Sequence, residues 1–196
     1  MSHSIRRPNA RFMLCLSLLL AAVSAQADWT LENESSQLNF VSTKASHIAE
    51  THTFNELSGA ISDDGTAELV IDLASVNTGI GIRDQRMQTM LFDVVSFPDA
   101  QIRTRLDLSA LEALSTPTTL IIDAQLSLAG QTTSVTGKVL VVPMGGNRVS
   151  VTTVTPIIVQ AASLGLASGV EALREIAGLP SIGYSVPVTF SLTFTR

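Results

Sequence analysis

Two histidines and a glutamate lie within one short run, His47-Ile48-Ala49-Glu50-Thr51-His52, and imidazole and carboxylate groups are common metal ligands. The five-residue step between the histidines does not place both on one helical face, unlike the four-residue step of zinc proteases. His47, Glu50 and His52 could still ligate a metal ion from a loop. The alternative interpretation is that they are polar residues at the rim of a connection between two strands.

Other residues that carry enzyme chemistry lack the spacing that the chemistry needs. The only cysteine is Cys15, no Gly-x-Ser-x-Gly elbow is present, and no glycine-rich phosphate loop occurs. We therefore expect a protein that is not an enzyme and that needs no cofactor.

Four arginines lie close together in the sequence: Arg83, Arg86, Arg103 and Arg105. Guanidinium groups bind phosphates through paired hydrogen bonds, so these residues are candidates for holding a phosphate group. The alternative is ordinary surface charge, with Arg83 paired to Asp84 or Asp93 for a structural purpose. Arg103 and Arg105 alternate with their neighbours at strand spacing, so we expect both to face solvent.

The N-terminal segment has the three parts of a secretory signal peptide. Arg6, Arg7 and Arg11 precede the apolar run 12–23, and the small-x-small pattern Ala25-Gln26-Ala27 follows it. The apolar run is shorter than the roughly 20 residues of a membrane-spanning helix. We expect a signal peptide at residues 1–27, an exported domain at 28–196, a periplasmic location, and no membrane span after cleavage.

The charge of the exported domain excludes one class of partner. Loss of Arg6, Arg7 and Arg11 lowers Lys plus Arg from 12 to 9 against 17 Asp plus Glu, so the net charge becomes −8. Nucleic-acid binding requires a basic surface that faces the phosphates. We therefore expect no nucleic-acid partner.

Apolar and polar residues alternate with the two-residue period of β-strands over most of the exported domain. The clearest segments are 67–73, 120–128, 135–141 and 188–195. Turn residues at 63–65, 129–131 and 143–147 separate such segments and indicate antiparallel neighbours. Eight or nine strands of this kind in a single domain predict a closed barrel or a sandwich.

Two segments have helical rather than strand spacing. The first covers residues 78 to about 91. The second is expected at about 169–177, where Ser168 and Glu171 have the spacing of a capping box and Gly178 and Pro180 follow as a stop.

Motifs along the whole exported domain resemble those of the YceI-like family. They are Trp29-Thr30-Leu31, Leu38-Asn39-Phe40, Phe54 with Leu57, Gly59 and Ile61, Thr78 with Arg83-Asp84, Leu91-Phe92-Asp93 with Phe97-Pro98, and Leu126-Ser127-Leu128 with Gly130 and Thr132. Each motif alone is weak, but their order and spacing together are fairly specific. One departure lies at residues 162–165, where Ala-Ser-Leu-Gly replaces the Ser-Asp-Phe-Gly of many members.

The resemblance implies an all-β fold, an antiparallel lipocalin-like barrel of about eight strands with one or two short helices. It further implies an apolar cavity that binds a polyisoprenoid or another long-chain amphiphilic lipid. The residues expected to line this cavity are Phe40, Leu69, Ile71, Met87, Met90, Leu91, Phe92, Ile122, Leu126, Leu128, Val139, Phe190 and Leu192. Met87, Met90, Leu91 and Phe92 are expected at its entrance, and Arg83 and Arg86 are candidates for holding the lipid head group.

Two further possibilities follow from the same pattern. A barrel of this size can instead be filled by its own side chains, which would favour a structural or stress-response protein whose partner is another protein. An unpaired strand edge near Asp28 could also pair with a second copy of the chain, giving a homodimer.

Overall fold

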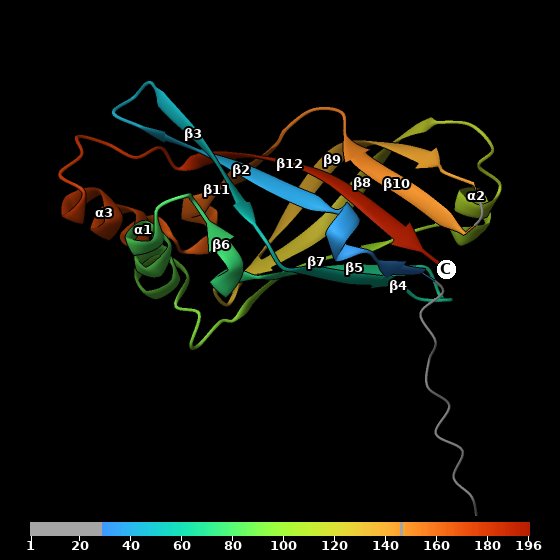
Figure 1. Ribbon diagram of the computed structural model, residues 1–196, viewed down its shortest axis with the longest axis horizontal. Helices are drawn as coiled ribbons and strands as arrows, with labels where there is room; N and C mark the ends of the chain where they lie inside the picture. The colour runs from blue at the N-terminus through green and yellow to red at the C-terminus, as the bar shows by residue number, and fades with distance from the viewer. Residues whose placement is uncertain (1–28, 146) are drawn as a thin grey trace, which may run out of the picture.

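The structure, a computed structural model, describes residues 29–145 and 147–196. Figure 1 shows an elongated barrel with helices at both of its ends. The predicted signal peptide, residues 1–27, and its cleavage site lie outside the described residues. Within the described part of the chain, no helix has the length and apolar character needed to cross a membrane.

Eight antiparallel strands form a closed barrel, which confirms the predicted fold. In order around the ring they are β1 (Trp29–Leu31), β4 (Leu57–Ile61), β5 (Thr66–Asp72), β7 (Asp99–Arg105), β8 (Thr118–Leu128), β9 (Gln131–Pro143), β10 (Arg148–Thr153) and β12 (Ser185–Thr195). The ring closes between β1 and β12, where Thr30 pairs with Thr195. Thr30 also pairs with Ala60 of β4, so β1 is hydrogen-bonded on both sides and offers no free edge to a second copy.

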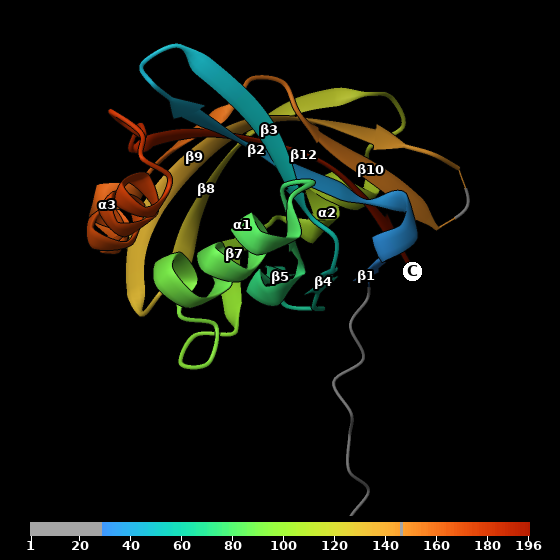
Figure 2. The same cartoon turned by 60° about the vertical axis from the view of Figure 1, so that its left-hand side comes forward.

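Four strands lie outside the ring: β2 (Gln37–Lys44), β3 (Ile48–Phe54), β6 (Val76–Asn77) and β11 (Ile157–Gln160). Two of them, β2 and β11, pair with β12, whereas β3 pairs with β2 and β6 pairs with β3. β12 changes partners along its length. Its C-terminal part pairs with β1 and β10, and its N-terminal part pairs with β2 and β11. Figure 2 shows β2 and β3 extending beyond the ring and passing over α1.

Three short helices and several single turns complete the fold. α1 (Gly81–Arg86) runs directly into a π-helical turn, η3 (Met87–Phe92). α3 (Ala167–Ile176) packs beside η3. These confirm the two helices expected from the sequence. A third helix, α2 (Leu108–Glu112), was not predicted and lies at the opposite end of the barrel (Figure 1). The remaining turns are η1 (Asn33–Ser35), η2 (Leu73–Ser75) and η4 (Ala161–Leu164).

The capping box predicted for the second helix is wrong. α3 begins after Leu166, which provides no side-chain cap, and Ser168 lies inside the first turn. Glu171 does not reach back to the helix start, because it accepts hydrogen bonds from Arg174 Nε (2.6 Å) and Tyr184 Oη (2.7 Å). The predicted stop is correct, since Gly178 adopts a left-handed φ of 62°.

The alternation of side chains along β8 and β9 follows the prediction, whereas on β12 Thr193 is buried together with Leu192 and Phe194. On β8, Ala124 and Leu126 are buried inside the barrel, whereas the alternate residues Asp123 and Gln125 face solvent. β9 repeats the pattern, with Val139 and Val141 buried. The interior wall that β8 and β9 contribute is therefore aliphatic.

Candidate functional site

A cavity of about 420 Å³ lies inside the barrel. Of the thirteen residues expected to line it, six do so: Leu69, Ile122, Leu126, Val139, Phe190 and Leu192. They come from β5, β8, β9 and β12, so the cavity is bounded by strands on several sides of the ring. Aliphatic side chains of this kind leave a dry space that accepts apolar guests.

The other predicted residues lie outside the lining of this cavity: Phe40, Ile71, Met87, Met90, Leu91, Phe92 and Leu128. Phe40, Ile71, Met87 and Phe92 are buried in the packed core. Leu91 and Leu128 are half-buried against that core, and Met90 is exposed. The structure thus separates the predicted set into a group around the cavity and a group associated with the helical end of the barrel.

Aromatic packing explains why the helical end is filled. The ring of Phe54 lies 5.3 Å from Phe40 and 6.0 Å from Phe92, measured between centroids. These rings close the interior beneath α1 and η3 at contact spacing. The cavity occupies the part of the barrel where most inward side chains are valine, leucine, isoleucine and alanine.

The cavity reaches the surface at the end that carries α2. β7 and β8 are paired only between residues 101–103 and 125–127, so the first half of β8 has no described strand on that side. Lining residues at this edge include Leu111 and Leu114, together with the exposed Ala110 and Ile121. The segment around α2 therefore covers the gap between β7 and β8.

Sequence reasoning missed α2, although a local signal for it was present. Asp107 caps the helix by accepting hydrogen bonds from Ala110 N (3.2 Å) and Ser109 Oγ (2.6 Å). Leu108 and Leu111 follow at helical spacing and pack against the core. The segment was overlooked because a helix this short produces only one turn of the pattern.

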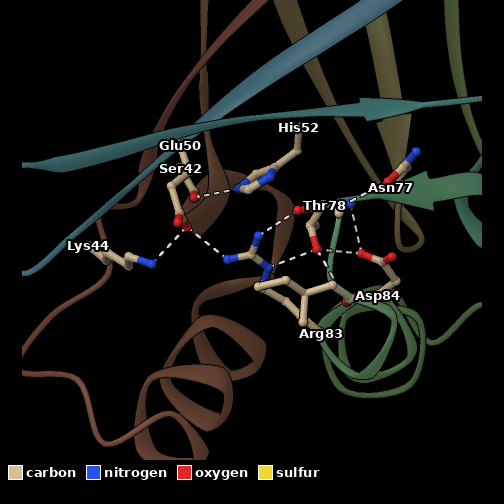
Figure 3. A network of polar contacts seen from close by, with 10 residues as sticks. Ser42, Lys44, Glu50, His52, Asn77, Thr78, Arg83 and Asp84 are labelled. Carbon is tan, nitrogen blue, oxygen red and sulfur yellow. Dashed lines mark hydrogen bonds and ion pairs between the residues drawn. The ribbon is translucent and has the colours of Figure 1, made fainter.

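A polar network ties α1 to β3 at the helical end (Figure 3). Arg83 Nη1 donates to Glu50 Oε2 (2.8 Å), and Arg83 Nη2 donates to the Thr78 carbonyl (2.7 Å). Lys44 Nζ also lies 2.9 Å from Glu50 Oε2. Thr78 Oγ1 accepts from Arg83 Nε (2.8 Å) and donates to Asp84 Oδ1 (2.5 Å). We call these five residues the clasp.

The hydrogen bonds of the clasp give Arg83 a structural role that needs no ligand. Its guanidinium is occupied by Glu50 and Thr78, rather than by Asp84 or Asp93 as the structural alternative had it. The hydrogen bond from Lys44, aided by Arg83, lowers the pKa of the Glu50 carboxyl below its ordinary value, although partial burial opposes this. Arg86 is half-buried, forms no ion pair with any described residue, and does not line the cavity.

His52 lies beside the clasp and points into the packed core. Only 3% of it is exposed, its Nε2 is 2.8 Å from Ser42 Oγ, and its ring lies 5.1 Å from that of Phe40. Its Nδ1 has no hydrogen-bond partner among the described residues. Burial, followed by the charge of Arg83, lowers the pKa of His52.

These positions do not assemble the metal site considered from the sequence. His47 is exposed in the turn between β2 and β3, whereas His52 is buried and Glu50 is held by two cations. Within residues 29–145 and 147–196, no group of three or more His, Cys, Asp or Glu is arranged to hold a metal ion.

Residues 162–165, the departure from the family motif, form η4 and its end. Leu164 is completely buried in a small cluster with Leu126 and Val170. Gly165 follows with a left-handed φ of 73°. The side chain of Leu164 thus packs against Val170 of α3.

A closed antiparallel barrel around one apolar cavity defines a lipocalin-like protein. The chain belongs to the YceI-like domain family, whose sequence model matches residues 29–194. No curated protein sequence matches this chain.

Solved structures of similar proteins agree with this assignment. A polyisoprenoid-binding domain from Saccharophagus degradans, implicated in plant cell wall breakdown, is 37% identical, covers 87% of this chain and 99% of its own, and superposes with a TM-score of 0.84. BcnA from Burkholderia cenocepacia is 17% identical, covers 83% of this chain and 98% of its own, and superposes with a TM-score of 0.65. The YceI protein of Campylobacter jejuni is 13% identical, covers 74% of this chain and 84% of its own, and superposes with a TM-score of 0.53. The last two show likeness of fold alone.

Proposed function

We propose that this protein binds or carries one long-chain amphiphilic, polyisoprenoid-like lipid in the periplasm, without covalent chemistry. The observation that carries the proposal is the aliphatic cavity of about 420 Å³ inside a closed barrel. The 37% identical domain from Saccharophagus degradans, which is described as polyisoprenoid-binding, supports the same class of ligand. The signal-peptide pattern at residues 1–27 supports export.

The size of the cavity sets the length of chain that it can enclose. A dry cavity of about 150 Å³ holds one benzene, so 420 Å³ accommodates roughly 17 carbon atoms. This corresponds to about three isoprene units, and a longer chain would extend through the gap beside α2. Burial of about 17 carbons contributes roughly 14 kcal/mol before the costs of association.

Native mass spectrometry of protein purified from a periplasmic extract without detergent tests the proposal. We expect an added mass that disappears on organic extraction and is recovered in the extract as a long-chain lipid. A protein that carries no added mass, and acquires none with polyprenyl or fatty-acyl lipids, would contradict lipid binding. Recovery of the protein only from the cytoplasmic fraction would contradict the proposed location.

A further inference from the structure

We propose that the head group of the bound lipid is an oxyanion, and that it binds at the α2 end of the barrel in a second cavity. This inference rests on the proposed function, because it specifies the head group and the direction of the same ligand. It also moves the head-group site from Arg83 and Arg86, where the sequence placed it, to Arg148 and Arg196.

The second cavity adjoins the first. It has a volume of about 260 Å³, and Leu111, Leu114 and Val149 line both cavities. These three side chains therefore form the wall between an apolar space and a more polar one. An amphiphile whose chain fills the first cavity would reach the second past these side chains.

The polar groups of the second cavity suit a negatively charged head group. Arg148, Arg196 and Asn147 line it, and no Asp or Glu side chain is among its lining residues. Two of the nine basic residues of the exported domain thus lie around one small cavity, in a domain with a net charge of −8. Guanidinium groups bind phosphate and carboxylate through paired, charge-assisted hydrogen bonds.

Both arginines are held in place by their surroundings. Arg148 Nη2 donates to Glu32 Oε2 (2.5 Å), and a guanidinium has further N–H donors beyond that one. The Arg196 guanidinium lies over the ring of Trp29, 5.9 Å from its centroid. Asn147 fixes the backbone of Arg196, because its carbonyl accepts from Arg196 N (2.8 Å) and its Nδ2 donates to Arg196 O (3.2 Å).

The helical end lacks these properties. All three guanidinium nitrogens of Arg83 already donate within the clasp, and Arg86 lines neither cavity. The aromatic rings of Phe40, Phe54 and Phe92 also fill the interior between that end and the apolar cavity. A chain lying in the cavity therefore has a cationic neighbour at the α2 end, across the side chains of Leu111, Leu114 and Val149.

Binding of three test ligands with 15 or 16 carbons would test the inference. Farnesyl phosphate and palmitate carry an oxyanion, and farnesol has the same chain as farnesyl phosphate without the charge. The affinity of delipidated protein for each ligand is measured by titration calorimetry. The proteins compared are the wild type, Arg148→Gln, Arg196→Gln, and the matched control Arg86→Gln, which removes the same charge at the helical end.

We expect the wild type to bind at least one oxyanion ligand about tenfold more tightly than farnesol, the difference expected of hydrogen bonds to a charged group. Arg148→Gln and Arg196→Gln should remove most of that preference and leave farnesol affinity unchanged, whereas Arg86→Gln should preserve it. Preference for farnesyl phosphate would identify a phosphate head group, and preference for palmitate a carboxylate.

Two outcomes would overturn the head-group site while leaving lipid binding intact. The first is equal affinity of the wild type for all three ligands. The second is a preference that is lost in Arg86→Gln or kept in both Arg148→Gln and Arg196→Gln. Failure of every ligand to bind would instead contradict the proposed function itself, so the two failures are distinguishable.

Discussion

Replacement of Ala124 by phenylalanine should shorten the lipid chain that the protein prefers. Ala124 is buried on β8 and lines the apolar cavity, so the added ring has empty space to enter. A phenyl ring needs about the space of benzene, roughly 150 Å³, which is about a third of the 420 Å³ available. The preferred chain should therefore fall from about 17 carbons to about 11.

The cost for a long chain follows from the carbons that the ring displaces. About six methylenes at about 0.8 kcal/mol each give a loss of up to roughly 5 kcal/mol for a ligand that filled the cavity. Ligand-free protein should become no less stable, because the ring fills an existing space rather than overpacking the core. Affinities for a series of primary alcohols of increasing chain length would measure the shift.

Thr119→Phe is the matched control, because Thr119 lies on the same strand and is exposed on its outer face. It should leave the preferred length unchanged. Val151→Phe, at another lining position, repeats the test from β10. A folded Ala124→Phe protein with the wild-type chain-length profile would refute the reasoning, since the chain could not then lie in this cavity.

Four other changes have defined expected outcomes. Arg83→Ala should lower the free energy of unfolding, measured by urea denaturation, by about 1–3 kcal/mol, because clasp partners are left unpaired. Lipid affinity should stay within about a factor of two. A large loss of affinity without loss of stability would instead show that Arg83 binds the lipid. Because the pKa of Glu50 is lowered from 4.5, its contribution to stability is present above that value and is lost as the pH falls through the folded pKa; Glu50→Gln should flatten this acid limb of the stability profile. The pKa of His52 is lowered from 6.5, so the unfolded chain takes up the proton before the folded protein does, and stability should decrease as the pH falls below 6.5. If His52→Phe leaves the pH dependence of the unfolding free energy unchanged in this range, the reasoning is contradicted. A Cβ added at Gly169 would lie 2.6 Å from the Met90 carbonyl oxygen, so Gly169→Ala should push α3 away from η3 and lower the thermal midpoint of unfolding. The control Ala167→Gly, on the same helix, should lower the midpoint only through its lower helix propensity.

The strand pattern predicted most of the fold because a barrel wall imposes a strict two-residue period. Ala124 and Leu126 face inward and Asp123 and Gln125 face outward, as their alternation required. Local periodicity does not reveal which strand ends separate. The gap between β7 and β8, and the helix that covers it, depend on pairing between distant segments.

The site could be predicted only in part for a related reason. Leu69 and Phe92 are both inward-facing apolar residues, and the sequence gives no measure of whether the space beside each is filled. Aromatic rings from β2, β3 and η3 meet at the helical end, whereas aliphatic residues leave the cavity near α2. The ion pairs could not be predicted either, because the glutamates that pair with Arg83 and Arg148 lie 33 and 116 residues away in the sequence.

The partner change along β12 has a consequence for how the protein is made. Because Thr30 pairs with Thr195, ring closure is among the most non-local contacts in the chain, and such contacts form late and slowly. Until β12 joins, β1, β2, β10 and β11 all lack a neighbour and the interior stays open to water. A lipid can therefore be enclosed by the barrel only after β12, the last strand in the chain, has joined the ring.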